Sequence, residues 1–501
     1  MVRLRHLSRH LVEEHVATFA LISWPIVVFV LFAKLPLRSA LIWSLLLAYL
    51  YLPEKFGINL PGLPPLQKTS IPALAVITAL LIFSRRKAGR GAMSEDEVLL
   101  ENNYRLFTWL FFGLAVGLLV NMGLTIATNR APIIIGETFL PGLRPWDFVS
   151  MTSNTVFMMI PFFLGRQYLA RPADHRQLLK CIVIAGLGYS LLFLVEIRLS
   201  PQFHRWVYGF HQHSFLQHIR DGYRPKLFLP HGLDVGFFLL TTVFAAFALA
   251  RGKGIPKRSR WVIAAVWLLL MLLISKNLGA TAITLVLLPL LWLSRRLAFW
   301  AVLVITLSFL MYPLVRQTGL VPVTKVAEVA NSISADRAQS FVFRLVNEDR
   351  LLARAAQKPV SGWGGWGRAR VYNEQGRDIS VTDGLWIIIL GERGWVGYLC
   401  FFGLLTLPLL IMPKVGRRKE VPLETIALAL IMTGNIIYLI PNSTLSPIAW
   451  LMIGALAGFV QFDAKSADVT EARKKPRPSQ PGYTRFPEPL PENLTMMEAK
   501  I

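Results

Sequence analysis

The residues best suited to bind an anionic group are arginines near the ends of long apolar segments. Arg224 stands just before the stretch Phe228 to Leu233, at the mouth of one such segment. Because a guanidinium is costly near lipid and matches phosphate oxygens in bidentate geometry, such arginines favour diphosphate binding. Taken singly, each could instead be an interfacial anchor or a surface ion-pair partner. Five more arginines occupy one long hydrophilic stretch: Arg344, Arg350, Arg354, Arg368 and Arg370.

Asp383 is the carboxylate best placed to act as a base. It lies in Thr382-Asp383-Gly384, directly before the apolar segment that begins at Leu385. Thr and Asp are preferred helix caps and a negative charge suits a helix N-terminus, so capping is one interpretation. Abstraction of a hydroxyl proton is the other, and a cap would hold that base rigidly. Glu392 would lie about 13 Å away along a continuous helix, too far for paired acid–base work.

The histidines do not form a firm metal motif. The pattern His-x-His can bind zinc, but no second pair of ligands completes it, so we expect solvated interfacial histidines and no metal or other cofactor. The chain has only two cysteines, Cys181 and Cys400, both inside apolar segments, which makes redox chemistry an unlikely function. Five of the nine histidines lie close together: His204, His211, His213, His218 and His231.

The composition excludes a soluble protein of several domains. The 501 residues are 54% hydrophobic and only 16% charged, whereas soluble proteins are about 25% charged. The surplus predicts lipid-facing helices. The net charge of +24 raises nucleic acid as a partner, but the basic residues form short clusters between apolar segments. That distribution is typical of cytoplasmic loops and excludes a nucleic-acid face.

About thirteen apolar segments are long enough to suggest membrane spans. The short apolar stretch 385–390 is expected to be a stub that packs against the span after it. Basic loops place 85–105, 166–177, 251–260, 294–297 and 414–422 in the cytoplasm. The expected spans are 17–33, 37–52, 70–84, 106–128, 146–165, 178–199, 227–250, 261–275, 280–293, 298–314, 395–413, 423–440 and 446–462.

The predicted fold is therefore an all-α, polytopic membrane bundle of about 12–14 spans with one long, partly helical periplasmic loop. Helical spacing from Phe341 to Gln357 supports the helix in that loop, and Trp363 and Trp366 lie in the Gly-rich turn after it. The expected divisions are N-terminal spans with a basic loop (1–105), a central bundle (106–313), the long loop (314–394), C-terminal spans (395–462) and a disordered cytoplasmic tail (463–501).

Three blocks, in order and spacing, resemble the O-antigen ligase and O-antigen polymerase superfamily of bacterial inner-membrane proteins, and its exopolysaccharide polymerase-like members. Arg224-Pro225 followed by His231-Gly232 resembles the family's Arg-Pro block. Residues 274–280 resemble its Ser/Arg/Gly/Ala block, and 359–367 resemble the Gly-rich turn before its catalytic helix. Gly394-Trp395-Val396-Gly397 falls in register with the family's Gly-x-x-Gly. The resemblance covers roughly 220–415.

Two positions depart from the family pattern. Asp383 and Gly384 stand where the family has its catalytic histidine and the amide or hydroxyl after it, and no histidine follows His231. Leu278 replaces the arginine of the second block, which leaves Lys276 as the nearby cation. Either the aspartate performs the histidine's role, or this branch has changed or lost the activity.

The resemblance implies a metal-independent, inverting glycosyltransferase on the periplasmic face of the inner membrane. It would polymerise or ligate a glycan carried by a polyprenyl diphosphate, with a glycan or lipid as acceptor and the bilayer as its environment. A chain-length regulator and export proteins are candidate partners. Asp383 would be the catalytic base, and a transporter or flippase of the same glycan is the alternative. The expected substrate-binding residues are Arg224, His231, Lys276, Arg350, Arg368, Arg370 and Trp363.

Overall fold

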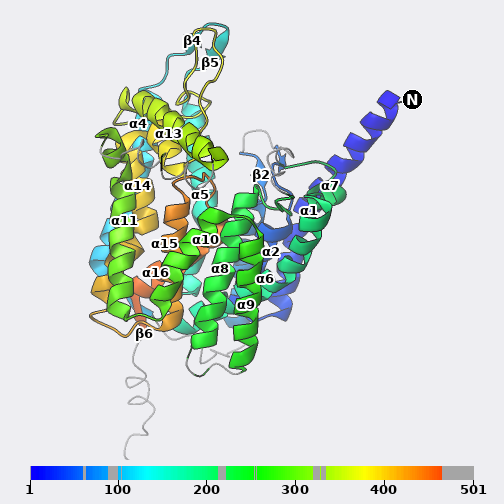
Figure 1. The fold of residues 1–501 in the computed structure, drawn as a ribbon, viewed down its shortest axis with the longest axis vertical. Helices are drawn as coiled ribbons and strands as arrows, with labels where there is room; N and C mark the ends of the chain where they lie inside the picture. The colour runs from blue at the N-terminus through cyan, green and yellow to red at the C-terminus, as the bar shows by residue number, and fades with distance from the viewer. Residues whose placement is uncertain are drawn as a thin grey trace, which may run out of the picture.

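The structure is a bundle of antiparallel helices with almost no sheet (Figure 1). It is a computed structural model, and it describes residues 2–59, 64–88, 100–102, 104–212, 222–252, 254, 257–319, 328 and 335–464. The helices are α1 (Val2–Lys34), α2 (Leu37–Tyr51), α3 (Ser70–Ala88), α4 (Arg105–Ala127), α5 (Pro145–Tyr168), α6 (Pro172–Leu199), α7 (Phe203–Tyr208), α8 (Gly232–Arg251), α9 (Arg258–Ile274), α10 (Leu278–Leu287), η2 (Leu288–Leu291), α11 (Arg295–Gln317), α13 (Ala335–Ala356), α14 (Leu385–Val415), α15 (Leu423–Tyr438) and α16 (Pro447–Gln461).

Three small strand pairings complete the secondary structure of the described residues. Each is antiparallel and two-stranded, so none forms a layer of its own. The second pairing joins a strand before α4 to the strand that follows α16, which ties distant parts of the chain together. The strands are β1 (Gly57–Ile58) with β2 (Leu66–Gln67), β3 (Leu100–Asn102) with β6 (Phe462–Ala464), and β4 (Ile133–Ile135) with β5 (Thr138–Leu140).

The all-α membrane fold is confirmed. All thirteen predicted apolar segments are helical, and seven helices of the described chain are long and apolar enough to cross a membrane. Five more apolar helices are shorter, so the count of thirteen spans stays a prediction. The chain is thus a multi-pass membrane protein. α8 is the most enclosed of the seven, whereas α1, α4 and α11 turn large apolar side chains outward as lipid-facing helices must.

The predicted interruption between the stretch 385–390 and the span after it is confirmed, because α14 consists of two helical stretches that meet at a kink at Gly394, whose backbone is non-helical (φ +64°). One predicted boundary was wrong for an identifiable physical reason. The span predicted at 227–250 begins five residues later at Gly232, because Leu227 has a positive φ and Pro230 precedes the helix. The predicted tail 463–501 lies outside the described residues except for the last two residues of β6.

The bundle has two chemically different ends. The end near β6 gathers the described parts of the predicted basic loops, and we call it the basic end. Lys419, for example, donates to the Phe462 carbonyl at 3.2 Å, and Arg295 pairs with Glu420. α13 and the β4–β5 hairpin lie at the opposite end (Figure 1). We call that end the loop end, because α13 and the described residues between α13 and α14, all from the predicted long loop 314–394, lie there.

The predicted chain divisions do not behave as separate layers. α16 packs along α5, α14 packs along α4, and α2 packs along α6. Helices from the N-terminal, central and C-terminal divisions are therefore interleaved in one bundle. This packing brings the start of α8, the end of α15 and the start of α14 together at the loop end.

Candidate functional site

The carboxylate of Asp383 faces an arginine of α13. Arg344 Nε lies 3.2 Å from Asp383 Oδ2, and both side chains are between one third and two fifths exposed. The capping interpretation was wrong, because Gly384 is the residue that precedes the first turn of α14 and no side chain caps it. The Leu385 N–H donates to main-chain carbonyls of the α15–α16 connection instead. Asp383 is therefore oriented by a cation at the surface of the loop end.

One face of α13 positions the segment that carries Asp383. The Val381 N–H donates to Asn347 Oδ1 at 3.0 Å, and Arg350 Nη1 donates to the Ile379 carbonyl at 3.4 Å. Together with Arg344, these α13 residues are spaced three apart, so they lie on one face of the helix. Arg350, predicted to bind substrate, thus lies beside the Asp383 segment and also helps to hold it.

Arg224 and Lys276 lie against glycines near the start of α8. The Arg224 stem crosses Gly232 so closely that a Cβ there would be 3.1 Å from Arg224 Cδ. Lys276 adopts a left-handed backbone (φ +55°), and its Nζ lies 3.2 Å from the position of a Cβ on Gly222. Both glycines therefore give room to a cation.

Tyr438, at the end of α15, lies between these two groups. Its hydroxyl donates to the Leu233 carbonyl at 2.6 Å and accepts from Asn277 Nδ2 at 2.9 Å. The carbonyl of the next residue, Leu439, accepts the Leu385 N–H at 3.1 Å. The end of α15 thus links the start of α8 to the start of α14, through a tyrosine that the sequence did not single out.

His231 begins α8 and is engaged by the helix. The His231 side chain accepts the Leu233 N–H at Nδ1, at 3.1 Å. The main-chain N–H of His231 donates to Asp234 Oδ2 at 3.1 Å. This reciprocal capping box fixes the first turn of α8. His231 therefore precedes the glycine that Arg224 crosses, and its Nδ1 is used by the backbone.

A buried charge cluster lies beneath the start of α8. Lys68 is 7% exposed, pairs with Glu54 at 3.1 Å and donates to the Phe228 carbonyl at 2.8 Å. Burial lowers the pKa of Lys68, and the neighbouring Glu54 opposes that shift. Asp234 is 3% exposed and lies within the electrostatic reach of both. The sequence did not reveal this cluster, because Glu54, Lys68 and Asp234 come from three separate segments and only the fold brings them together.

Arg368 has a different role from the one predicted. It is 2% exposed, and its guanidinium donates to the carbonyls of Trp363 at 3.2 Å, Pro141 at 2.8 Å and Ala131 at 3.0 Å. Three nitrogens are thus used by backbone oxygens, and the side chain joins the Gly/Trp-rich turn to the base of the β4–β5 hairpin. We do not include Arg368 among the proposed phosphate ligands.

Trp363 and Arg370 are also engaged within the loop. The Arg354 guanidinium lies 3.5 Å from the centre of the Trp363 ring, and Lys358 Nζ lies 4.6 Å from it. Burial lowers the pKa values of Arg354 and Lys358, and nearby cations add to this shift. Arg370 pairs with Asp378 at 2.5 Å; although burial raises the pKa of Asp378, bonds from Arg370 and Ser380 hold it below its usual value. The structure does not bring these residues to Tyr438.

The Gly-rich turn packs into the break in α14. At Gly394 the helix ladder is interrupted, and the Trp395 N–H donates to the Pro359 carbonyl at 2.6 Å. The Gly364 N–H donates to the Glu392 carbonyl at 2.8 Å. A Cβ on Gly362 would lie 2.5 Å from that same carbonyl oxygen, so only glycine fits. The Gly-x-x-Gly pattern therefore marks the place where the loop docks onto α14.

The prediction that the histidines are solvated and interfacial was wrong for His204. This side chain is 1% exposed; its Nε2 accepts from the Glu54 N–H at 3.1 Å, and its Nδ1 bonds the Phe210 carbonyl at 2.8 Å. Burial lowers the pKa of His204 to about 4. His213 and His218 lie outside the described residues. Within the described ranges, no three His, Cys, Asp or Glu residues are grouped so as to hold a metal ion.

Fold and site together define a multi-pass, all-α membrane protein with a cluster of charged groups at the loop end. Comparison with known proteins adds no relative: no protein-family model matches the chain, and no curated protein matches it.

Proposed function

We propose that the protein is a membrane glycosyltransferase that polymerises or ligates a polyprenyl-diphosphate-linked oligosaccharide. The observation that carries this proposal is that the starts of α8 and α14 both bond to the end of α15, which brings Arg224 and the Arg344–Asp383 pair to the same end of the bundle. A carboxylate beside several cations at a bundle end suits a substrate that combines a diphosphate, a sugar hydroxyl and a lipid chain. The basic loops at the opposite end support an extracytoplasmic position for the site.

In the proposed reaction, Asp383 accepts the proton of the acceptor hydroxyl while that oxygen bonds to the anomeric carbon. The bond from the anomeric carbon to the phosphate oxygen breaks, and the polyprenyl diphosphate leaves with its electron pair. Arg224 and Lys276 stabilise the negative charge on the leaving group. Arg344 first orients the carboxylate of Asp383. When Asp383 takes up the proton, Arg344 turns toward the diphosphate.

Asp383→Asn tests this proposal, with Asp378→Asn as its matched control. Both aspartates lie in the same loop and each pairs with one arginine, but only Asp383 lies at the site. In cells that contain only the variant, D383N is expected to abolish long glycan chains and to accumulate the lipid-linked donor. D378N should retain most chain formation. Normal chain length with D383N present at the wild-type level would overturn the catalytic role.

An assay without a membrane distinguishes an enzyme from a transporter of the same glycan. Purified protein in detergent, given lipid-linked donor, has no compartment into which to move it. The proposed enzyme is expected to lengthen the glycan under these conditions, and Asp383→Asn to stop that reaction. A protein that binds the donor through Arg224 but never extends it would instead support transport.

A further inference from the structure

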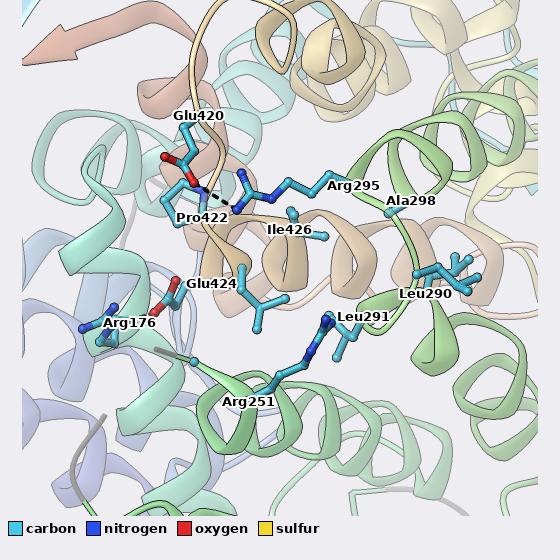
Figure 2. A pocket seen from close by; sticks show the side chains of 13 residues that line it. Arg176, Arg251, Leu290, Leu291, Arg295, Ala298, Glu420, Pro422, Glu424 and Ile426 are labelled. Carbon is cyan, nitrogen blue, oxygen red and sulfur yellow. Dashed lines mark hydrogen bonds and ion pairs between the residues drawn. The ribbon is translucent and has the colours of Figure 1, made fainter. Parts of the chain in front are cut away.

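The basic end contains two adjoining cavities that the proposed function does not use. Their volumes are about 280 and 480 Å³, and they share Arg295 and Glu420. Figure 2 shows the smaller cavity, between the end of α8, η2 and the starts of α11 and α15. We call the two together the basic cleft. Its charged lining residues are Arg176, Arg251, Arg295, Arg296, Arg417, Lys419, Glu420 and Glu424.

Part of this charge is balanced within the protein. In the smaller cavity, Arg176 pairs with Glu424 at 2.7 Å and Arg295 pairs with Glu420 at 3.0 Å. Arg251 points toward Leu291 in Figure 2 and has no acidic partner among the residues that the structure describes. Two ion pairs thus leave this cavity with one surplus cation.

The larger cavity has a greater surplus. Lys419 donates to the Phe459 carbonyl at 2.6 Å, so its ammonium group stabilises the end of α16. Arg296 and Arg417 are exposed, and neither forms an ion pair within the described ranges. Two guanidiniums facing a cavity of about 480 Å³ match the charge and bidentate geometry of a phosphate group.

An exposed apolar strip leads away from the larger cavity along α11. Trp300 lines the cavity and is 45% exposed; it is followed by Val304 at 55%, Leu307 at 44% and Met311 at 44%. Their spacing of four, three and four residues places them in one row along the helix. A ligand with a phosphate in the cleft would thus have apolar surface directly beside it for a hydrocarbon chain.

We propose that the basic cleft binds the headgroup of an anionic phospholipid, with its acyl chains along the exposed α11 strip. Cytoplasmic leaflets are rich in anionic lipid, and basic pockets between helix ends are suited to bind phosphate headgroups. The strip distinguishes a lipid from a free phosphate ester, which would use the cations alone. This proposal depends on the fold and not on the proposed glycan chemistry.

The test uses full-length protein in detergent and native mass spectrometry with added phosphatidylglycerol or phosphatidylcholine. Wild type is expected to retain phosphatidylglycerol preferentially, and Arg296→Gln with Arg417→Gln to reduce this retention by about tenfold, as loss of charge-assisted hydrogen bonds predicts. The control is Arg258→Gln with Arg260→Gln, two exposed arginines at the start of α9 that line neither cavity. Equal retention in both double variants would overturn the proposal.

Competition by glycerol phosphate is the second part of the test, because this compound has the phosphate ester without the acyl chains. At the same concentration as phosphatidylglycerol, it is expected to displace little of the bound lipid. Val304→Asn with Leu307→Asn should weaken lipid retention while leaving both arginines in place. Equal competition by glycerol phosphate, or unchanged retention in the strip variant, would overturn the assignment of a lipid and leave a phosphate site.

Discussion

Two groups of arginines at the loop end have the same side chain but opposite roles in the structure. Arg224 lies against Gly232 at the start of α8, and Arg344 lies beside the accessible carboxylate of Asp383. Arg368 and Arg354 instead hold the Gly/Trp-rich turn, through backbone carbonyls and the face of Trp363. The sequence therefore shows which arginines lie near the membrane. The groups that each arginine contacts determine whether it can bind a substrate or instead stabilises the fold.

Arg368→Gln is expected to have the largest effect on stability. It removes a buried guanidinium that bonds three carbonyls at once, which should cost about 4 kcal/mol. Arg370→Gln breaks only a partly exposed ion pair and should cost less than about 1 kcal/mol. Unfolding of both purified variants in detergent measures the difference. Equal stability of the two would show that Arg368 is not the residue that holds the turn.

Glu348→Gln tests the attachment of α13, on which both groups depend. Glu348 lies 3.4 Å from Arg316, and burial raises its pKa to about 7, although Arg316 opposes that shift. Because the unfolded chain loses this proton at a lower pH, stability should fall as pH rises from about 4.5 to about 7. The contribution is on the order of 3 kcal/mol.

Thermal unfolding at pH 5 and pH 8 measures this contribution. Wild type is expected to lose stability between the two values more than Glu348→Gln does, since the amide stays neutral throughout. Asp349→Asn is a useful control, because Asp349 also pairs with Arg316 but is more exposed. The same pH dependence in wild type and Glu348→Gln would contradict the assignment.

Trp363→Leu is expected to have the smallest effect of the three. It removes the ring beneath Arg354 and Lys358 and the indole bond to the Arg354 carbonyl at 2.8 Å. Such a change should cost about 1–2 kcal/mol and leave donor binding at the site intact. A calorimetric titration with donor is the measurement. Loss of binding in a stably folded variant would favour the stacking of sugar on Trp363 instead.

The sequence predicted the bundle well, because lipid requires long apolar helices and those are visible in composition and length. It also predicted the helix at 341–357. It did not predict Tyr438 or the Lys68–Glu54 pair, since their roles arise from contacts between distant segments. Arg368 was misassigned because periodicity does not reveal which carbonyls surround a guanidinium.

Direct binding of a polyprenyl diphosphate to the purified protein tests the central claim. Arg224→Gln and Arg344→Gln should each weaken binding by about tenfold or more, because each removes charge-assisted bonds to phosphate. Arg377→Gln is the control, since this exposed arginine lies in the same loop but not at Tyr438. Wild-type affinity in Arg224→Gln and Arg344→Gln, or an equal loss in Arg377→Gln, would contradict a diphosphate site at the loop end.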